Sequence, residues 1–336
     1  MATPNILRTA VSNLLDTIAR RKEARIDNLS EKQMLSLLPV LTAHKIESLA
    51  LLSIFPNSGI REFYLQTHLT QLNTVKWLLS ADMMYSGAIF LQGFPRCLEL
   101  SAMYTPGMRS DIDIYIPPEH LANFQHAALA AGFDYYGFDD TDIFVVNDAQ
   151  RSALLAESWA NKEVTLTHLQ EVTIPDALPI EIADCYLPYI RRHNKLYLMT
   201  ALEVHHFYLE PRDASIIEHY SEMWPVMGAK RSSLEALIYF NLIRLYKGIL
   251  HNERRIRLLL DIACLLANRQ ENINTASLQS LLNESTVSSR LGALCHVLQN
   301  FHPAFTYLQQ FASATSVETE LLTTALGTML NAGEDL

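Results

Sequence analysis

One six-residue stretch of the chain alternates strictly between two kinds of side chain. In Asp111-Ile112-Asp113-Ile114-Tyr115-Ile116, aspartate or tyrosine alternates with isoleucine. Such alternation is typical of a β-strand with one face in a core and the other face toward solvent or a ligand. Long stretches before and after it repeat their apolar residues at helical spacing instead. The pattern therefore predicts an α+β fold, in which a central region that contains strands is flanked by helical regions.

The hydrophobic period divides the chain into three predicted regions. Residues 1–85 form a helical N-terminal region, which ends in a long helix over 60–85. Residues 86–224 contain the alternating stretch and form an α/β core. Residues 225–336 return to the helical period, most clearly over 234–267, and form a helical C-terminal domain.

Shorter signals predict the elements of the central region. Proline favours the first turn of a helix, and glycine often ends one. Apolar or alternating runs of a few residues predict strands. The predicted elements are strands over 88–93, 111–116, 133–136, 142–147 and 196–207, a short helix over 95–103, and a helix over 117–131 that Gly132 ends.

Charge and composition limit the kind of partner. Acidic residues outnumber basic residues 36 to 26, so a nucleic acid would meet net repulsion. The four cysteines form no CxxC pair, which argues against a zinc knuckle or a disulfide framework. No signal peptide and no membrane-spanning stretch is apparent, so a cytoplasmic location without membrane association is expected.

Asp111 and Asp113 are candidates for a metal site. Because side chains of a strand point alternately to its two faces, these carboxylates are expected side by side on one face. Like charges so close are unfavourable unless a positive charge lies between them. Magnesium suits this position, since it is commonly bound through one or two carboxylates and substrate phosphates. An isolated D-x-D pair is more often a solvated strand end.

The residues around the pair favour the metal site. The strand predicted before it ends in Gln92-Gly93, and glycine lets a backbone approach a phosphate closely. Arg109 and Ser110 stand directly before the aspartates. The Arg109 guanidinium can meet phosphate oxygens or can simply be exposed to solvent.

These residues resemble the pattern of the DNA polymerase β-like nucleotidyltransferase superfamily. That pattern is a strand ending in glycine, a short helix, and then S-D-[ILV]-D-[ILV]. Within the superfamily the chain is similar to an uncharacterised bacterial branch with four ordered segments. The matching segments here are Leu91–Gly93, Arg109–Ile116, Glu203–His205 and Leu259–Ala263. The resemblance implies a nucleotidyltransferase-type mixed sheet flanked by helices. Gln92 in place of the usual lysine, Phe94 after the glycine, and the closeness of Arg109 to Asp111 are departures that affect the phosphate contacts.

The resemblance also implies a third carboxylate on a neighbouring strand. Glu203 matches it best, although it follows Asp113 far along the chain. A third acid can complete a second metal position and accept the proton of an acceptor hydroxyl. His205 shares the strand face of Glu203 and can orient the acceptor or a phosphate. Without the resemblance, Glu203 is better interpreted as a surface acid and His205 as an ordinary strand histidine. Glu181 and Asp184 are the rival candidates.

The C-terminal helices add weaker candidates. Lys247 can either bind a triphosphate or lie in water. Asp261 is an acid inside an apolar run, and Arg257 lies four residues before it on the same predicted helix face. Most such pairs stabilise a helix and have no further role.

The resemblance implies a metal-dependent nucleotidyltransferase. It would move an NMP from an NTP, with ATP expected, to a hydroxyl of a small molecule, peptide or protein, with Mg2+ or Mn2+ as cofactor. A catalytically inactive binding or assembly module is the first alternative, and a toxin-like transferase acting on tRNA is the second. The expected metal ligands are Asp111, Asp113 and Glu203, and the expected nucleotide-binding residues are Gln92, Gly93, Arg109, Ser110, His205, Lys247 and Asp261.

Overall fold

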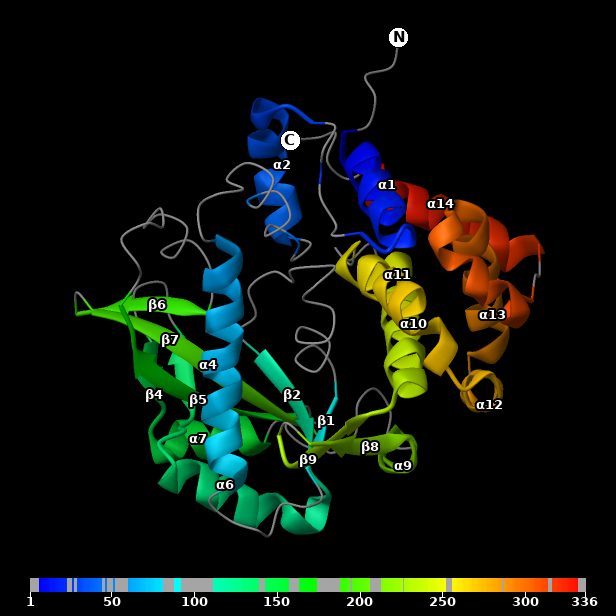
Figure 1. The fold of residues 1–336 in the computed structure, drawn as a ribbon. Coiled ribbons are helices and arrows are strands. Elements are labelled where there is room, and N and C mark those ends of the chain that lie inside the picture. Colours follow the sequence, from blue (N-terminus) through cyan, green and yellow to red (C-terminus); the bar gives the residue numbers. More distant parts are fainter. Residues whose placement is uncertain are drawn as a thin grey trace. The chain divides into compact units, whose positions relative to one another are not determined.

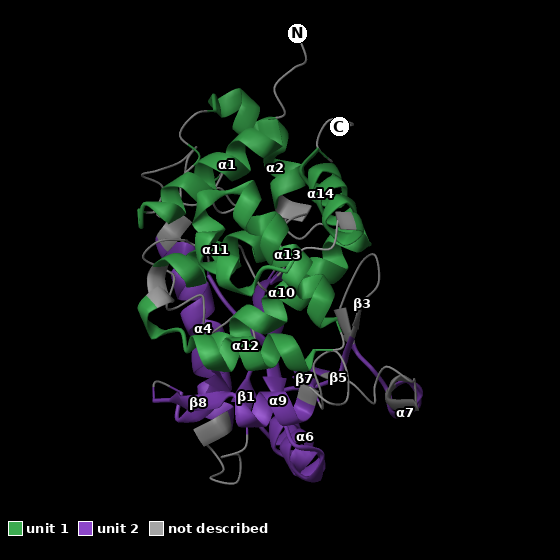
Figure 2. Cartoon of the chain, turned by 90° about the vertical axis from the view of Figure 1, so that its right-hand side faces the viewer, with its two compact units in different colours: residues 1–61, 99–107, 234–336 green, residues 62–98, 108–233 purple. Residues whose placement is uncertain are grey.

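The computed structural model of the chain forms two compact units (Figure 2). Unit 1 comprises residues 1–61, 99–107 and 234–336, and unit 2 comprises residues 62–98 and 108–233. The structure describes residues 6–22, 26, 29–43, 46, 51, 60–80, 88–91, 111–138, 143–156, 163–173, 188–193, 195–205, 213–225, 227–251, 256–285, 287–313 and 316–331.

All secondary-structure elements in the described residues of unit 1 are helices. Its helices are α1 (Ile6–Ala19), α2 (Glu31–Ala43), α10 (Leu234–Leu250), α11 (Ile256–Arg269), η4 (Gln270–Asn272), α12 (Thr275–Glu284), α13 (Ser288–Phe301), η5 (Pro303–Phe311) and α14 (Ser316–Asn331). Cys264 and Cys295 are buried free thiols on α11 and α13, while Cys97 and Cys185 lie outside the described residues. No helix in the described part of the chain is long and apolar enough to cross a membrane.

Unit 2 contains the sheets and the helices beside them. The helices are α4 (Ile60–Ser80), η2 (Pro118–His120), α6 (Leu121–Ala130), α7 (Asp148–Ala156) and α9 (Asp213–His219). The strands are β1 (Ile89–Phe90), β2 (Asp111–Tyr115), β3 (Tyr136–Phe138), β4 (Ile143–Val145), β5 (Glu163–Glu171), β6 (Tyr189–Arg192), β7 (Lys195–His205), β8 (Ser221–Trp224) and β9 (Ala229–Ser232).

The described strands form a mixed seven-stranded sheet in the order β5-β7-β2-β1-β9-β8, with β6 paired to β7. β2 runs parallel to β7, and β1 runs parallel to β9. The other pairs in this sheet are antiparallel, and β3 and β4 form a separate two-stranded sheet. The predicted combination of helices with a mixed sheet is confirmed.

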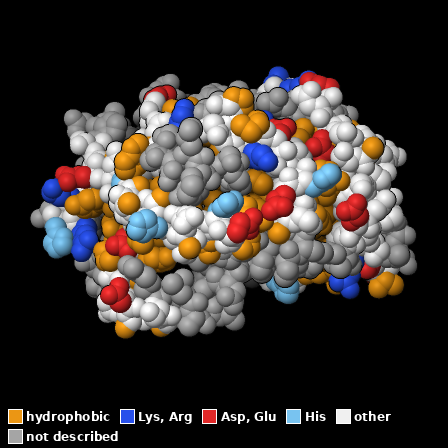
Figure 3. Space-filling view, turned by 90° about the horizontal axis from the view of Figure 1, so that it is seen from below, with side chains coloured by type: hydrophobic (Ala, Val, Ile, Leu, Met, Phe, Trp, Pro, Cys, Tyr) orange, Lys and Arg blue, Asp and Glu red, His pale blue; other side chains and the backbone are white. Residues whose placement is uncertain are grey.

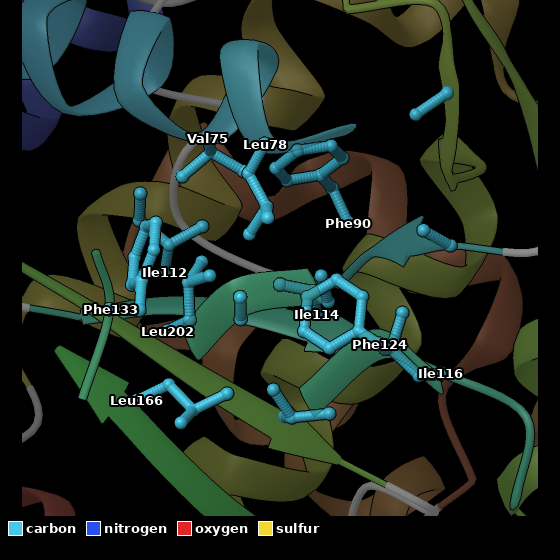
Figure 4. Packing of buried hydrophobic residues seen from close by; sticks show 14 of the residues in the cluster. Val75, Leu78, Phe90, Ile112, Ile114, Ile116, Phe124, Phe133, Leu166 and Leu202 are labelled. Carbon is cyan, nitrogen blue, oxygen red and sulfur yellow. The ribbon is translucent and has the colours of Figure 1, made fainter. Parts of the chain in front are cut away.

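The core of unit 2 lies on the isoleucine face of β2. Ile112 pairs with Leu202 of β7, and Leu202 pairs in turn with Leu166 of β5, so three fully buried side chains form a row across the sheet. Residues of α4 and α6 pack against this face, which Figure 4 shows with Val75, Leu78 and Phe124 beside the strands. Figure 1 shows α4 in front of the sheet, crossing the direction of β7. Burial of one face of β2 leaves the aspartate face for other contacts.

The helix predicted over 117–131 is present as η2 and α6, and Gly132 ends it. Gly132 has a φ of +86°, a left-handed conformation that side chains with a Cβ adopt only under strain. Its N–H donates to Leu129, and the N–H of Phe133 donates to Ala128. These bonds satisfy the last carbonyls of the helix and turn the chain back toward the sheet.

Four strands of the sheet lie where the sequence analysis predicts none, namely β5, β6, β8 and β9. β9 lies beyond residue 224, the predicted end of the α/β core, yet its ladder with β1 makes it part of the sheet. β6, β8 and β9 have four residues each, too few to show a period, so pairing with a partner strand decides them. β5 has nine residues, and Val164 and Leu166 alternate with Thr165 and Thr167, a strand pattern that the prediction missed. The helix predicted over 95–103 lies outside the described residues.

Helix α4, from the predicted N-terminal helical region, belongs mostly to unit 2. Its buried residues Leu72, Val75 and Leu78 pack in the same cluster as Ile112 of the sheet. An apolar helix face is identical in sequence whether it packs on helices or on a sheet, so periodicity alone does not assign its partner.

Acidification is expected to destabilise unit 2 through His168 of β5. His168 is half-buried beside the ring of Phe133, and burial lowers its pKa from the usual 6.5. Because the folded state favours the neutral ring, this contribution is complete above pH 6.5 and is lost as pH falls through and below that value. Urea unfolding at about pH 7.5 and 5.5 should show a smaller loss of stability in His168→Gln than in the wild type. The control His126→Gln changes an exposed histidine and should lose as much stability as the wild type. An equal loss of stability in His168→Gln and the wild type would contradict the role of His168.

Candidate metal centre

The parallel pair of β2 and β7 brings distant residues to one place. In this ladder Asp113 is the Cα partner of Glu203, and Tyr115 is the partner of His205. Paired residues of adjacent strands project from the same face of a sheet. The ladder therefore places Asp113, Glu203 and His205 on the face of β2 and β7 opposite to the hydrophobic core of unit 2.

The three side chains form a compact group. Nε2 of His205 lies 3.0 Å from Oδ1 of Asp113 and 3.9 Å from Oε2 of Glu203. The ligand atoms of all three residues lie within 4.8 Å of one another. The Asp113 and His205 side chains are 10% and 4% exposed, whereas Glu203 is 29% exposed. The group is thus buried on one side and accessible beside Glu203.

Backbone hydrogen bonds hold this group from both sides. The N–H of Leu91, just beyond β1, donates to the carbonyl of Asp113 over 3.0 Å. The N–H of Ile116, just beyond β2, donates to the carbonyl of His205 over 3.1 Å. Because β2 is an interior strand with its apolar face fully packed, Asp113 has little freedom to move.

Two carboxylates and an imidazole at these distances can hold a divalent cation. Carboxylate oxygen and neutral imidazole nitrogen are both common metal ligands. A bound cation would relieve the repulsion between the paired acids Asp113 and Glu203. The accessible side next to Glu203 leaves room for water or a substrate to complete the coordination.

The structure brings together some of the predicted site residues and places others elsewhere. Asp111 lies on the same strand and face as Asp113, but it is half-buried opposite Ala201 and is outside the group of three. Glu203 does lie beside Asp113, from a strand far along the chain. The catalytic roles of these acids stay predictions.

Other predicted residues lie outside the group. Lys247 on α10 and Asp261 on α11 belong to unit 1, whereas the group belongs to unit 2. Asp261 is buried, with its Oδ2 3.7 Å from Nε of Arg257 one helical turn away, the ordinary helix pair that the spacing allows. The remaining predicted residues, Gln92, Gly93, Arg109 and Ser110, and the rivals Glu181 and Asp184, lie outside the described residues.

Tyr115 is a neighbour of the group that the sequence analysis does not single out. It shares the strand face of Asp113, and its hydroxyl donates to Oε1 of Glu218 on α9 over 2.6 Å. Burial, and then the Glu218 carboxylate, raise the pKa of the Tyr115 phenol, so it stays a neutral donor at ordinary pH. Its position two residues after Asp113 predicts that both side chains lie on one strand face. Its contact with Glu218 on α9 depends on the tertiary structure and has no signal in the sequence.

Comparison of the chain with protein-family models, with curated proteins and with solved structures gave no match.

Proposed function

We propose that the chain is a metal-dependent nucleotidyltransferase of the polymerase β-like type. It moves a nucleoside monophosphate from an NTP, with ATP expected, to a hydroxyl of a small molecule, peptide or protein. The observation that carries the proposal is the group of Asp113, Glu203 and His205, built from an Asp-x-Asp strand and its parallel neighbour. The D-I-D-I pattern after Ser110 supports it through the resemblance.

The sheet supports a nucleotidyltransferase-type fold within this proposal. The family pattern asks for a carboxylate on a strand beside the Asp-x-Asp strand, and Glu203 pairs directly with Asp113. Figure 3 shows acidic, basic and histidine side chains interspersed among apolar ones on the described part of one face. Over the whole chain acidic residues outnumber basic residues 36 to 26, and this balance suits a small or protein acceptor better than a polyanion. The cytoplasmic location expected from the sequence is part of the proposal.

The residues of the group divide the work of the proposed transfer. A bound divalent ion supplies neutralisation of phosphate charge and orientation of the reacting oxygens. Asp113 and Glu203 would hold it, and the rigid ladder fixes their separation. Glu203, the most accessible of the three, would accept the proton of the acceptor hydroxyl. That oxygen forms a bond to the α-phosphorus, and the bond from the α-phosphorus to pyrophosphate breaks.

A catalytically silent binding module is the second candidate. The observation in its favour is Gln92, which replaces the lysine usual in the related pattern and removes a charge that would grip phosphates. Such a module would bind a nucleotide and transfer nothing.

Nucleotide binding is expected to depend on metal, and to precede label transfer. At a ligand concentration about 100 times Kd, ATP with metal should stabilise the protein by about 2.7 kcal/mol, while ATP with a chelator should not. Glu203→Gln should lose most of this effect, because it removes a charge from the group. The shift in the thermal unfolding temperature measures this stabilisation. In a second experiment, NTP labelled at the α-phosphate is incubated with cell extract, and the labelled fraction identifies the acceptor. Metal-dependent stabilisation without label in any fraction would favour the silent module; label on RNA would select the tRNA-acting alternative.

A further inference from the structure

We infer that the group of Asp113, Glu203 and His205 selects a first-row transition cation, Mn2+ or Zn2+, over Mg2+, with Nε2 of His205 as a direct ligand. The inference rests on the metal group of the proposed function. It does not depend on the transfer reaction, because it concerns which ion the side chains bind.

The distances allow the imidazole to share one ion with each carboxylate, and the ligand atoms of all three residues lie within 4.8 Å of one another. Ligand atoms that bind an ion at about 2.1 Å lie at most about 4.2 Å apart. Nε2 of His205 is 3.0 Å from Oδ1 of Asp113 and 3.9 Å from Oε2 of Glu203, and both distances fall inside that limit. The shorter one equals the spacing of neighbouring ligands at right angles. An ion can therefore replace the Asp113–His205 hydrogen bond without movement of either strand.

The chemistry of the donor atoms separates the candidate ions. Mg2+ takes oxygen ligands and retains several waters, so an imidazole adds little to its binding affinity. Imidazole nitrogen suits zinc and its first-row neighbours, and carboxylate oxygen suits manganese. One nitrogen and two oxygens form a mixed set, for which affinity rises from Mn2+ to Zn2+. A site that used only the carboxylates would show the same order with smaller differences, because it lacks the nitrogen ligand that zinc favours.

Burial restricts the movement of the His205 side chain away from Asp113 and Glu203. Its side chain is 4% exposed, it is the last residue of β7, and its carbonyl accepts the N–H of Ile116. An imidazole fixed beside two acids contributes a nitrogen to any ion that enters. The Glu203 side chain is 29% exposed, so an ion can reach the group from solvent on that side.

His205 can alternatively act only by orienting Asp113. A hydrogen bond from an imidazole to a metal-binding carboxylate is a common supporting contact, and its loss weakens every ion similarly. A direct ligand instead discriminates between ions. The two roles therefore predict different patterns across Mg2+, Mn2+ and Zn2+.

Calorimetric titration of the full chain without nucleotide tests the inference. We expect the wild type to bind Mn2+ about 10-fold and Zn2+ about 100-fold or more tighter than Mg2+. His205→Gln keeps an amide that can hydrogen-bond to Asp113 but removes the ring nitrogen. It should weaken Zn2+ about 100-fold and Mg2+ less than about 3-fold. The same change at exposed His126 on α6 is the matched control and should alter neither.

A spectroscopic measurement on the wild type tests the inference without relying on a variant that folds. The electron spin-echo spectrum of the Mn2+-loaded protein should contain the nitrogen coupling of a directly bound imidazole. Three results would each overturn the inference. They are a spectrum without that coupling, wild-type affinity for Mg2+ as high as for Mn2+ and Zn2+, and an equal loss of affinity for all ions in His205→Gln. A protein that shows the coupling and the ion order but transfers no nucleotide would keep this inference and overturn the proposed reaction.

Discussion

Replacement of Asp113 by asparagine is expected to lower divalent-ion affinity by about 100-fold or more, and nucleotidyl transfer at least as much. Asp113 contributes the carboxylate that pairs with Glu203 and lies 3.0 Å from His205, so its charge is central to the group. Asparagine keeps the shape and can still hydrogen-bond to the imidazole. Metal titration and the rate of labelled NMP transfer measure the two effects.

Two variants control this prediction. Asp148→Asn makes the same change at an exposed residue of α7 in the same unit and should leave ion binding unchanged. Asp111→Asn tests the expectation that both aspartates bind metal, because Asp111 lies outside the group of three. A smaller loss than that of Asp113→Asn is expected. Wild-type ion binding by folded Asp113→Asn would refute the metal centre.

Truncation of Leu202 to alanine is expected to reduce the free energy of unfolding of unit 2 by about 2–5 kcal/mol. Leu202 is fully buried between its strand partners Ile112 and Leu166, and its removal leaves a cavity at the centre of the core. Leu202 precedes Glu203 but points to the opposite face. Calorimetric unfolding should therefore show a lower Tm, while ion affinity below the transition changes little.

Leu69→Ala on α4 is the matched control for this truncation. Its side chain is 37% exposed, so the same chemical change should cost less than about 0.5 kcal/mol. If Leu202→Ala cost no more than Leu69→Ala, the packing of the sheet in Figure 4 would be wrong.

Strong local patterns predicted their elements well. The alternation of Asp111 to Ile116 predicted β2 and its two faces, and proline and glycine predicted the limits of the helix that ends at Gly132. Other elements were missed, including the nine-residue strand β5 despite the alternation around Leu166. β9 carries too few residues to show a period, and the partner of α4 depends on which surface covers its apolar face.

The sequence by itself determined that Asp111 and Asp113 share a strand face, because alternation is a local property of the extended backbone. Only the tertiary structure decided that Glu203 pairs with Asp113, that His205 completes the group and that Asp111 stays outside it. The register between β2 and β7 sets these distances. That register results from the packing of Ile112 and Leu202 with Leu166 in the core, contacts between segments far apart in the chain that no local pattern encodes.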